Sequence, residues 1–98
     1  MAAKSCRKID ILVTATQIMR VIRDAKAPVN ITEVSRATGY SVDVVFRQLG
    51  TLYDERWVEK IGDGYVLGPE MYLCKARVKA QLEARRDEID KTLTEMEE

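Results

Sequence analysis

The side chains best suited to bind another molecule lie in one short segment, residues 40–47. Ser41 is a good helix N-cap, and the free amides at a helix start, with the positive end of the helix dipole, form a site for a phosphate. Arg47 can bind a guanine through the O6 and N7 atoms of the base. Its alternative role is a surface ion pair with Asp43, four residues earlier on the same helix. The segment therefore suggests contact with a nucleic acid.

The neighbours of Arg47 have two interpretations each. Phe46 can touch a thymine methyl group, but we favour packing of its ring against the first helix or the hairpin. Tyr40 can contact a phosphate near Ser41 or pack as a core ring. Asp43 can accept from a cytosine amine. Val42 lies on the same turn, and the apolar residues of this segment also favour a surface that binds protein.

Cations outside this segment could add affinity that does not depend on base sequence. Arg36 is expected on the helix that crosses the DNA backbone in a helix-turn-helix. Lys60 is expected on a hairpin strand, where an ion pair with Glu59 or Asp63 is the favoured alternative. Residues 1–8 hold Lys4, Arg7 and Lys8 and no acidic residue. This basic arm either enters a minor groove or is a solvated terminus.

Composition excludes several classes of function. The chain has 98 residues, 2 cysteines far apart and no histidine, which argues against a zinc site. It has no glycine-rich phosphate loop and no nucleophile beside a base, so we expect neither an enzyme nor a cofactor. The cysteines predict reduced thiols in a cytoplasmic protein. No apolar run is long enough for a membrane span or a signal peptide.

The charge balance argues against a simple DNA-binding interpretation. The chain carries 16 basic and 16 acidic residues, so its formal net charge is zero. Proteins that bind nucleic acid usually present a basic surface. Outside the arm, residues 9–68 are slightly acidic, and so are residues 69–98.

Three helices are predicted before residue 55. Apolar residues at spacings of three and four predict a helix over residues 9–26, ended by Pro28, with Val29 in a short edge strand. A second helix follows Asn30, whose side chain can form a capping box with Glu33, and Gly39 should close it in the left-handed conformation. Its inward residues are expected to be Val34 and Ala37.

The third helix should begin after Ser41 and bury Val45, Leu49 and Leu52, which follow an i, i+4, i+7 spacing. The opposite side of the helical wheel then carries Asp43, Arg47, Gly50 and Asp54.

A β-hairpin should follow the third helix. Residues 57–61 and 65–67 favour strands, and a Gly-Asp-Gly loop at residues 62–64 separates them. Trp57 is expected in the core beneath the third helix. This hairpin is the wing of a winged helix.

Residues 70–96 contain no glycine or proline and predict one long helix. Its heptad seam is only half apolar, with one line of positions at Lys75, Leu82, Ile89 and Met96 and a companion line at Met71, Val78, Arg85 and Thr92. The helix either forms a weak dimer zipper or packs on the body. We favour dimer contact, made by Val78, Leu82, Ile89 and Met96.

Residues 10–72 resemble the DNA-binding domain of the IclR family of bacterial transcription regulators. The resemblance is carried by Asn-Ile-Thr-Glu-Val-Ser-Arg-Ala-Thr-Gly, by Val-Val-Phe-Arg-Gln-Leu-Gly-Thr-Leu and by Gly-Asp-Gly-Tyr-Val-Leu-Gly-Pro. Too few residues follow the wing for the effector domain of that family. Val42-Asp43 and the Gly-Asp-Gly loop also replace basic and small polar residues that are typical of it.

The expected fold is mainly α with a small antiparallel β-hairpin: a winged helix-turn-helix plus a long C-terminal helix. We expect an arm at residues 1–8, the winged domain at 9–68 and a dimerisation helix at 69–98. The resemblance implies a sequence-specific transcription regulator, with helix 41–52 in the major groove of double-stranded DNA. Acting as a homodimer, it would place two such helices in successive grooves. The alternative is a winged-helix protein-interaction module that does not bind DNA.

Overall fold

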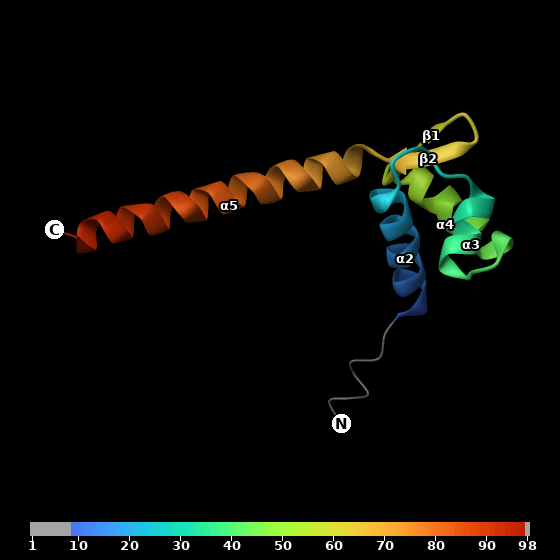
Figure 1. Cartoon of the computed structure of the whole chain (residues 1–98), viewed down its shortest axis with the longest axis horizontal. Helices are drawn as coiled ribbons and strands as arrows, with labels where there is room; N and C mark the ends of the chain where they lie inside the picture. The colour runs from blue at the N-terminus through green and yellow to red at the C-terminus, as the bar shows by residue number, and fades with distance from the viewer. Residues whose placement is uncertain (1–8, 98) are drawn as a thin grey trace, which may run out of the picture.

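The computed structural model describes residues 9–97. A compact head contains the helices α2 (Asp10–Asp24), α3 (Ile31–Thr38) and α4 (Val42–Asp54) and the strands β1 (Val58–Ile61) and β2 (Gly64–Leu67). A single long helix, α5 (Pro69–Met96), then leaves the head and extends away from it (Figure 1). The fold is the predicted winged helix-turn-helix with a long C-terminal helix.

Helix α2 ends two residues earlier than expected. Its last residue is Asp24, and the chain then runs extended through Ala25 before Pro28. Val29 forms the expected edge contact, a two-residue antiparallel bridge to Tyr65 with N–O distances of 3.2 and 2.8 Å. This bridge ties the α2–α3 connection to the outer edge of the wing.

Helices α3 and α4 are capped as predicted. Asn30 and Glu33 form a reciprocal capping box with distances of 2.8 and 2.9 Å, and Gly39 ends α3 with φ of 83°. Ser41 accepts a hydrogen bond from the Val44 amide at 3.2 Å. The turn between them is further held by Ser35, whose hydroxyl donates to the Tyr40 carbonyl at 2.6 Å. These contacts fix the direction in which α4 crosses α3.

One core holds the head together. Its buried residues come from three helices and both strands: Ile18, Ile22, Val34, Val45, Leu49, Leu52, Val58 and Tyr65. The expected stripe of α4 is therefore confirmed. Ala37 is exposed, which contradicts the expectation that it faces inward. On this eight-residue helix the buried line passes through Val34 alone.

The wing is a two-stranded antiparallel hairpin in which Val58 pairs with Leu67 and Ile61 with Gly64. The connecting turn has a positive φ of 63° at Gly62. The prediction that Trp57 lies in the core is wrong, because its side chain is 43% exposed. Trp57 precedes β1, and alternation along the strand places Val58, not Trp57, against α4.

Helix α5 has no buried residue. The alternative that it packs on the body is therefore wrong. Its first turn is nevertheless firmly joined to the head: the Gly68 amide donates to the Trp57 carbonyl at 2.9 Å, and the Glu70 amide donates to the Arg56 carbonyl at 3.1 Å. The Tyr72 hydroxyl adds a bond to the Leu67 carbonyl at 3.0 Å.

Candidate nucleic-acid interface

The outer side of α4 carries the four residues that the helical wheel placed there. Asp43, Arg47, Gly50 and Asp54 are all exposed, while Val45, Leu49 and Leu52 on the opposite side are buried. The helix thus has one face fixed in the core and one face open to solvent. An arrangement of this kind holds a recognition helix rigidly at the surface.

Arg47 forms the surface ion pair with Asp43 that the sequence offered as the alternative to DNA contact. Its Nε lies 3.5 Å from an oxygen of Asp43, and both side chains are more than 70% exposed. An exposed i, i+4 pair contributes only about 0.2–0.5 kcal/mol. The guanidinium can therefore leave Asp43 for a stronger partner such as a guanine edge.

Two apolar side chains share this face with Arg47. Val42 is 52% exposed and Phe46 is 60% exposed. The favoured interpretation that Phe46 packs against α2 or the wing is wrong, because its side chain is exposed. Exposed at this place, the ring can contact a base methyl group or another protein.

The start of α4 combines a cap with free amides. Ser41 is exposed and caps the helix, whereas Tyr40 is half-buried and packs against the core. Within residues 9–97, the amides of Val42 and Asp43 have no hydrogen-bond acceptor. With the positive end of the helix dipole, they could bind a phosphate.

The remaining predicted cations lie around this face rather than on it. Arg36 is exposed in the last turn of α3. Lys60 is exposed on β1 with its Nζ 5.8 Å from the centre of the Tyr65 ring, and the ion pairs found in residues 9–97 do not include it. Lys4, Arg7 and Lys8 lie outside the described residues.

The predicted dimerisation residues are all exposed on α5: Val78, Leu82, Ile89 and Met96. They are separate from the α4 face, so the head and α5 present two distinct surfaces. Residues 9–97 contain no helix with the length and apolarity needed to cross a membrane.

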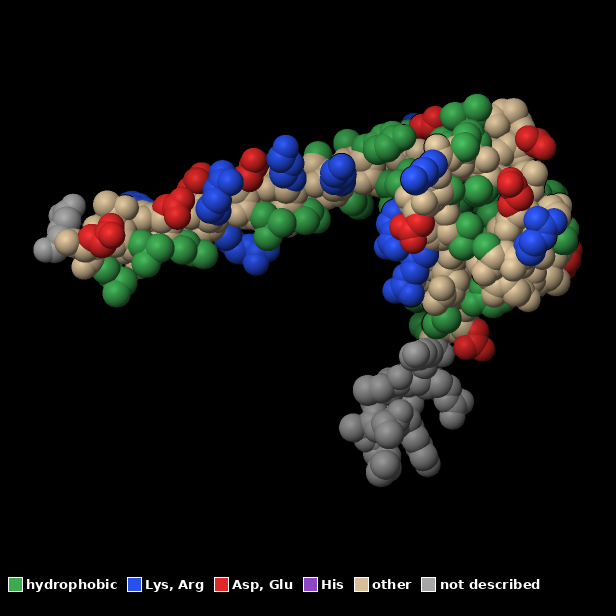
Figure 2. All heavy atoms as spheres, viewed as in Figure 1, with side chains coloured by type: hydrophobic (Ala, Val, Ile, Leu, Met, Phe, Trp, Pro, Cys, Tyr) green, Lys and Arg blue, Asp and Glu red, His purple; other side chains and the backbone are tan. Residues whose placement is uncertain are grey.

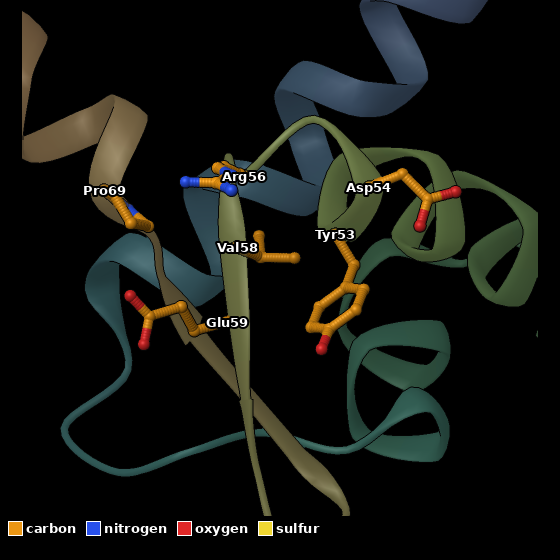
Figure 3. Close-up of a pocket in the computed structure, with 6 residues that line it drawn as sticks. All are labelled: Tyr53, Asp54, Arg56, Val58, Glu59 and Pro69. Atoms are coloured by element: carbon orange, nitrogen blue, oxygen red, sulfur yellow. The ribbon is translucent and has the colours of Figure 1, made fainter.

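A small cleft lies where α4, β1 and α5 meet (Figure 3). Tyr53, Val58 and Pro69 line it together with the charged residues Asp54, Arg56 and Glu59. The carboxylates of Asp54 and Glu59 point to opposite sides in Figure 3. They do not converge on a common point as a catalytic acid–base pair would.

A second, more apolar groove was not expected from the sequence. It runs between α2, the end of α4 and the start of α5, and its apolar lining includes Leu12, Met19, Trp57 and Met71. Arg20 and Arg23 border it. Arg23 also donates to Asp24 at 2.8 Å, which holds the pKa of that carboxyl below its usual value. The exposed Ile11 and Leu12 on the first turns of α2 were the signal available in the sequence.

Comparison with known proteins agrees with this geometry. A solved crystal structure from Silicibacter sp. TM1040, named as that of an ICLR transcriptional regulator, superposes with a TM-score of 0.66 at 20% identity. The alignment covers 72% of this chain and 28% of that one, so this chain spans well under half the length of its structural relative. No curated protein matches the chain significantly.

The family comparison covers the region from α2 to the wing turn. Residues 12–62, just over half of the 98-residue chain, match the IclR helix-turn-helix domain. The matched segment contains α3, α4 and β1, the elements that position Arg47 and its neighbours. The protein belongs to the IclR helix-turn-helix domain family.

Proposed function

We propose that the protein is a sequence-specific DNA-binding transcription regulator that acts as a homodimer, with α4 in the major groove. The observation that carries this proposal is the exposed outer face of α4, held on a complete core within a helix-turn-helix domain of the IclR family. The wing lies beside α4 and would contact the adjacent backbone.

Each exposed group on this face has a role that follows from its chemistry. The guanidinium of Arg47 leaves its ion pair with Asp43 and donates hydrogen bonds to a guanine edge. Phe46 contacts a thymine methyl group. The amides that follow Ser41 bind a phosphate, and Arg36 and Lys60 add phosphate contacts on either side. Val42 and Tyr40 border the contact, and Asp43 accepts from a cytosine amine.

Homodimer formation is supported by α5. A helix of 28 residues without a buried side chain gains little stability from the head beyond its first turn, and most helical stability in proteins comes from packing of an apolar face. A second copy that covers Val78, Leu82, Ile89 and Met96 would supply this stability. It would also provide two recognition helices for one operator.

The second candidate function is a protein-interaction module. The exposure of Val42 and Phe46 beside the acidic Asp43 favours it, because apolar and acidic residues are unusual in contact with phosphates. The two functions predict opposite behaviour toward DNA at low salt.

A salt titration on a random DNA duplex separates them. Arg36 and Lys60 of two copies would neutralise about four phosphates, so the logarithm of the association constant should fall with that of salt with a slope of about −3 to −4. An interaction module shows no measurable affinity for the duplex even at low salt. That result would reject the DNA-binding proposal.

Sequence preference tests the role of Arg47. Binding sites are first selected from a random duplex library with the wild-type chain. Arg47→Ala should then weaken binding to a selected site by about 1–3 kcal/mol and leave affinity for random duplex nearly unchanged. Lys91→Ala, which removes one cation near the far end of α5, is the matched control and should not change sequence preference.

A further inference from the structure

Six large apolar side chains form a straight stripe along α5. Met71, Leu82 and Leu93 are spaced by eleven residues, and so are Val78 and Ile89. Eleven residues are close to three full turns of an α-helix, so these side chains and Met96 fall within about 80° of one another around the helix axis. Leu93 replaces Thr92, which the heptad spacing had placed in the seam.

The stripe is open to solvent along the length of α5. Val78, Leu82, Ile89, Leu93 and Met96 are all exposed. Apolar side chains gather along the edge of α5 that faces the inside of the angle between α5 and α2 (Figure 2). A continuous apolar surface of this kind is typical of a helix that pairs with another chain.

The charges beside the stripe change sign at its middle. Residues 71–86 hold five basic residues and one acidic residue, whereas residues 87–97 hold five acidic residues and one basic residue. In the second half, Thr92 lies beside the stripe, and the charged residues beside it are acidic: Glu88, Asp90, Glu95 and Glu97. The exceptional Lys91 lies on the opposite side of the helix, away from the stripe.

We propose that two copies pair through α5 in antiparallel orientation, with the basic half of each helix against the acidic half of the other. The proposal rests on the homodimer of the proposed function and specifies its geometry. A parallel pair would place acidic half against acidic half and basic half against basic half. Like charges at such distances destabilise a pair of helices, so charge selects the antiparallel form.

One register brings the two apolar stripes together and also places unlike charges opposite each other. When Met71 lies opposite the partner's Met96, Val78 lies opposite the partner's Ile89. Asp90 then lies between the partner's Lys75 and the partner's Lys79 on one flank. On the other flank, Glu88 lies near the partner's Arg77. The aliphatic stem of Arg85 covers the partner's Leu82 at the centre, where the stripe has no apolar residue.

The same register brings the end of the partner helix to the apolar groove of the head. Met71 belongs to both the stripe and the groove, so the two surfaces are continuous. The partner's Leu93 and the partner's Met96 reach the groove beside Trp57 and Leu12. The acidic end of the helix then meets the basic border of α2, Arg20 and Arg23, and Figure 2 shows basic side chains on that side of α2.

The length of α5 suits two DNA-binding heads. At about 1.5 Å per residue, its 28 residues span about 42 Å. In an antiparallel pair, the heads lie at opposite ends of this rod. Their separation therefore exceeds the spacing of about 34–36 Å between successive major grooves, so it suits half-sites that lie more than one helical turn apart.

Distances between spin labels test the orientation directly. The chain carries Cys6→Ser and Cys74→Ser, and Glu95→Cys supplies one label per copy near the end of α5. In the antiparallel register the two Glu95 positions are about 35 Å apart along the rod, whereas in a parallel pair they lie side by side, about 10–20 Å apart. Glu83→Cys is the matched control, because a label near the centre gives a short distance in either orientation.

Each outcome decides one question. A distance of about 35–40 Å at Glu95 with a short distance at Glu83 supports the antiparallel dimer. Short distances at both positions overturn this orientation and leave the dimeric regulator standing. The absence of any dipolar coupling at concentrations of about 100 μM overturns the dimer itself. DNA binding by either species is measured separately by the salt titration.

Charge reversal gives a second, independent test. Glu88→Lys with Asp90→Lys places basic residues against the partner's Arg77 and the partner's Lys79 in the antiparallel dimer, so its dissociation constant should rise at least about tenfold at low salt. In a parallel dimer the changed residues of the two copies lie at the same level, so the dissociation constant should stay the same or fall. That result would overturn the proposal. Glu88→Gln with Asp90→Asn should give an intermediate value.

Discussion

The head and α5 are stabilised in opposite ways. All the buried hydrophobic residues of the described chain lie between Ile18 and Tyr65, and α5 has none, although it contains six large apolar residues on one side. The head is defined by contacts within one chain. Helix α5 makes no such contacts beyond its first turn, and its apolar side is open to solvent. Sequence patterns alone do not reveal this difference, because Leu49 and Leu82 occur in equally regular helical repeats.

The largest effect should follow from a cavity in the core of the head. Leu49→Ala should lower the free energy of unfolding by about 2–5 kcal/mol, because its side chain is fully buried in the core of the head. Urea unfolding followed by Trp57 fluorescence measures this. Leu82→Ala is the matched control, and an equal loss of head stability in that variant would abolish the distinction between the two regions.

The corresponding effect in α5 should appear in association. Leu82→Ala with Ile89→Ala should raise the dissociation constant of the dimer about 30–100-fold, because two large side chains lose their contact with the partner. The melting temperature of the head should stay unchanged. Sedimentation equilibrium measures the first quantity and calorimetry the second. Unchanged association would mean that the stripe is not the dimer surface.

Arg85→Leu should act in the opposite direction. It fills the central gap in the stripe and removes a cation that lies close to the partner's Arg85 near the two-fold axis. The dissociation constant should fall about tenfold, since one buried leucine side chain contributes about 1.5–3 kcal/mol when covered. Arg86→Leu, beside the stripe, should have a smaller effect. A weaker dimer after Arg85→Leu would contradict the register.

Loss of a helix cap should have a moderate effect confined to the head. Ser41→Ala and Asn30→Ala should each lower the free energy of unfolding by about 1 kcal/mol, because each removes an acceptor of a backbone amide. Thermal unfolding measures the change. Thr92→Ala on α5 is the comparison, because its hydroxyl donates only to the carbonyl of Glu88 within its own helix.

The smallest effect concerns the ion pair of α2. The hydrogen bond from Arg23 lowers the pKa of Asp24, so the pair contributes stability above the unfolded pKa of about 3.9 and loses it as the pH falls through the folded value. Both groups are exposed, so Asp24→Asn should not measurably alter head stability at pH 7. Urea unfolding at pH 7 and at pH 3 should therefore give the same stability for variant and wild type, and a clear loss at pH 7 that disappears at pH 3 would contradict this prediction.

Local signals in the sequence determined most of the head. The caps at Asn30 and Ser41, the glycine at position 39 and the buried side of α4 were predictable because each depends on neighbours within four residues. The errors were at Trp57, Ala37 and Phe46. Their exposure depends on which side of an element meets another element, and this is set by tertiary packing rather than local spacing.

The candidate site was predictable in residue type but not in arrangement. The wheel placed Arg47 on the outer side of α4, and its pair with Asp43 followed from their spacing. The apolar groove did not follow from the sequence, because Leu12, Trp57 and Met71 come from three distant segments. The exposure of the whole of α5 also required coordinates, since a half-apolar helix is compatible with packing on the body.

The joint between the head and α5 packs closely against the backbone of the head at Gly68. A Cβ atom at this position would lie 2.5 Å from the carbonyl oxygen of Arg56 and 2.9 Å from the amide of Val58, so no other residue fits without displacing backbone. This close packing and the hydrogen bonds from the Gly68 and Glu70 amides hold the start of α5 against the head. A residue inserted after the joint would rotate the head by about 100° relative to the stripe. In the proposed dimer, the number of residues between the joint and the two-fold axis would therefore set the phase and separation of the two halves of an operator.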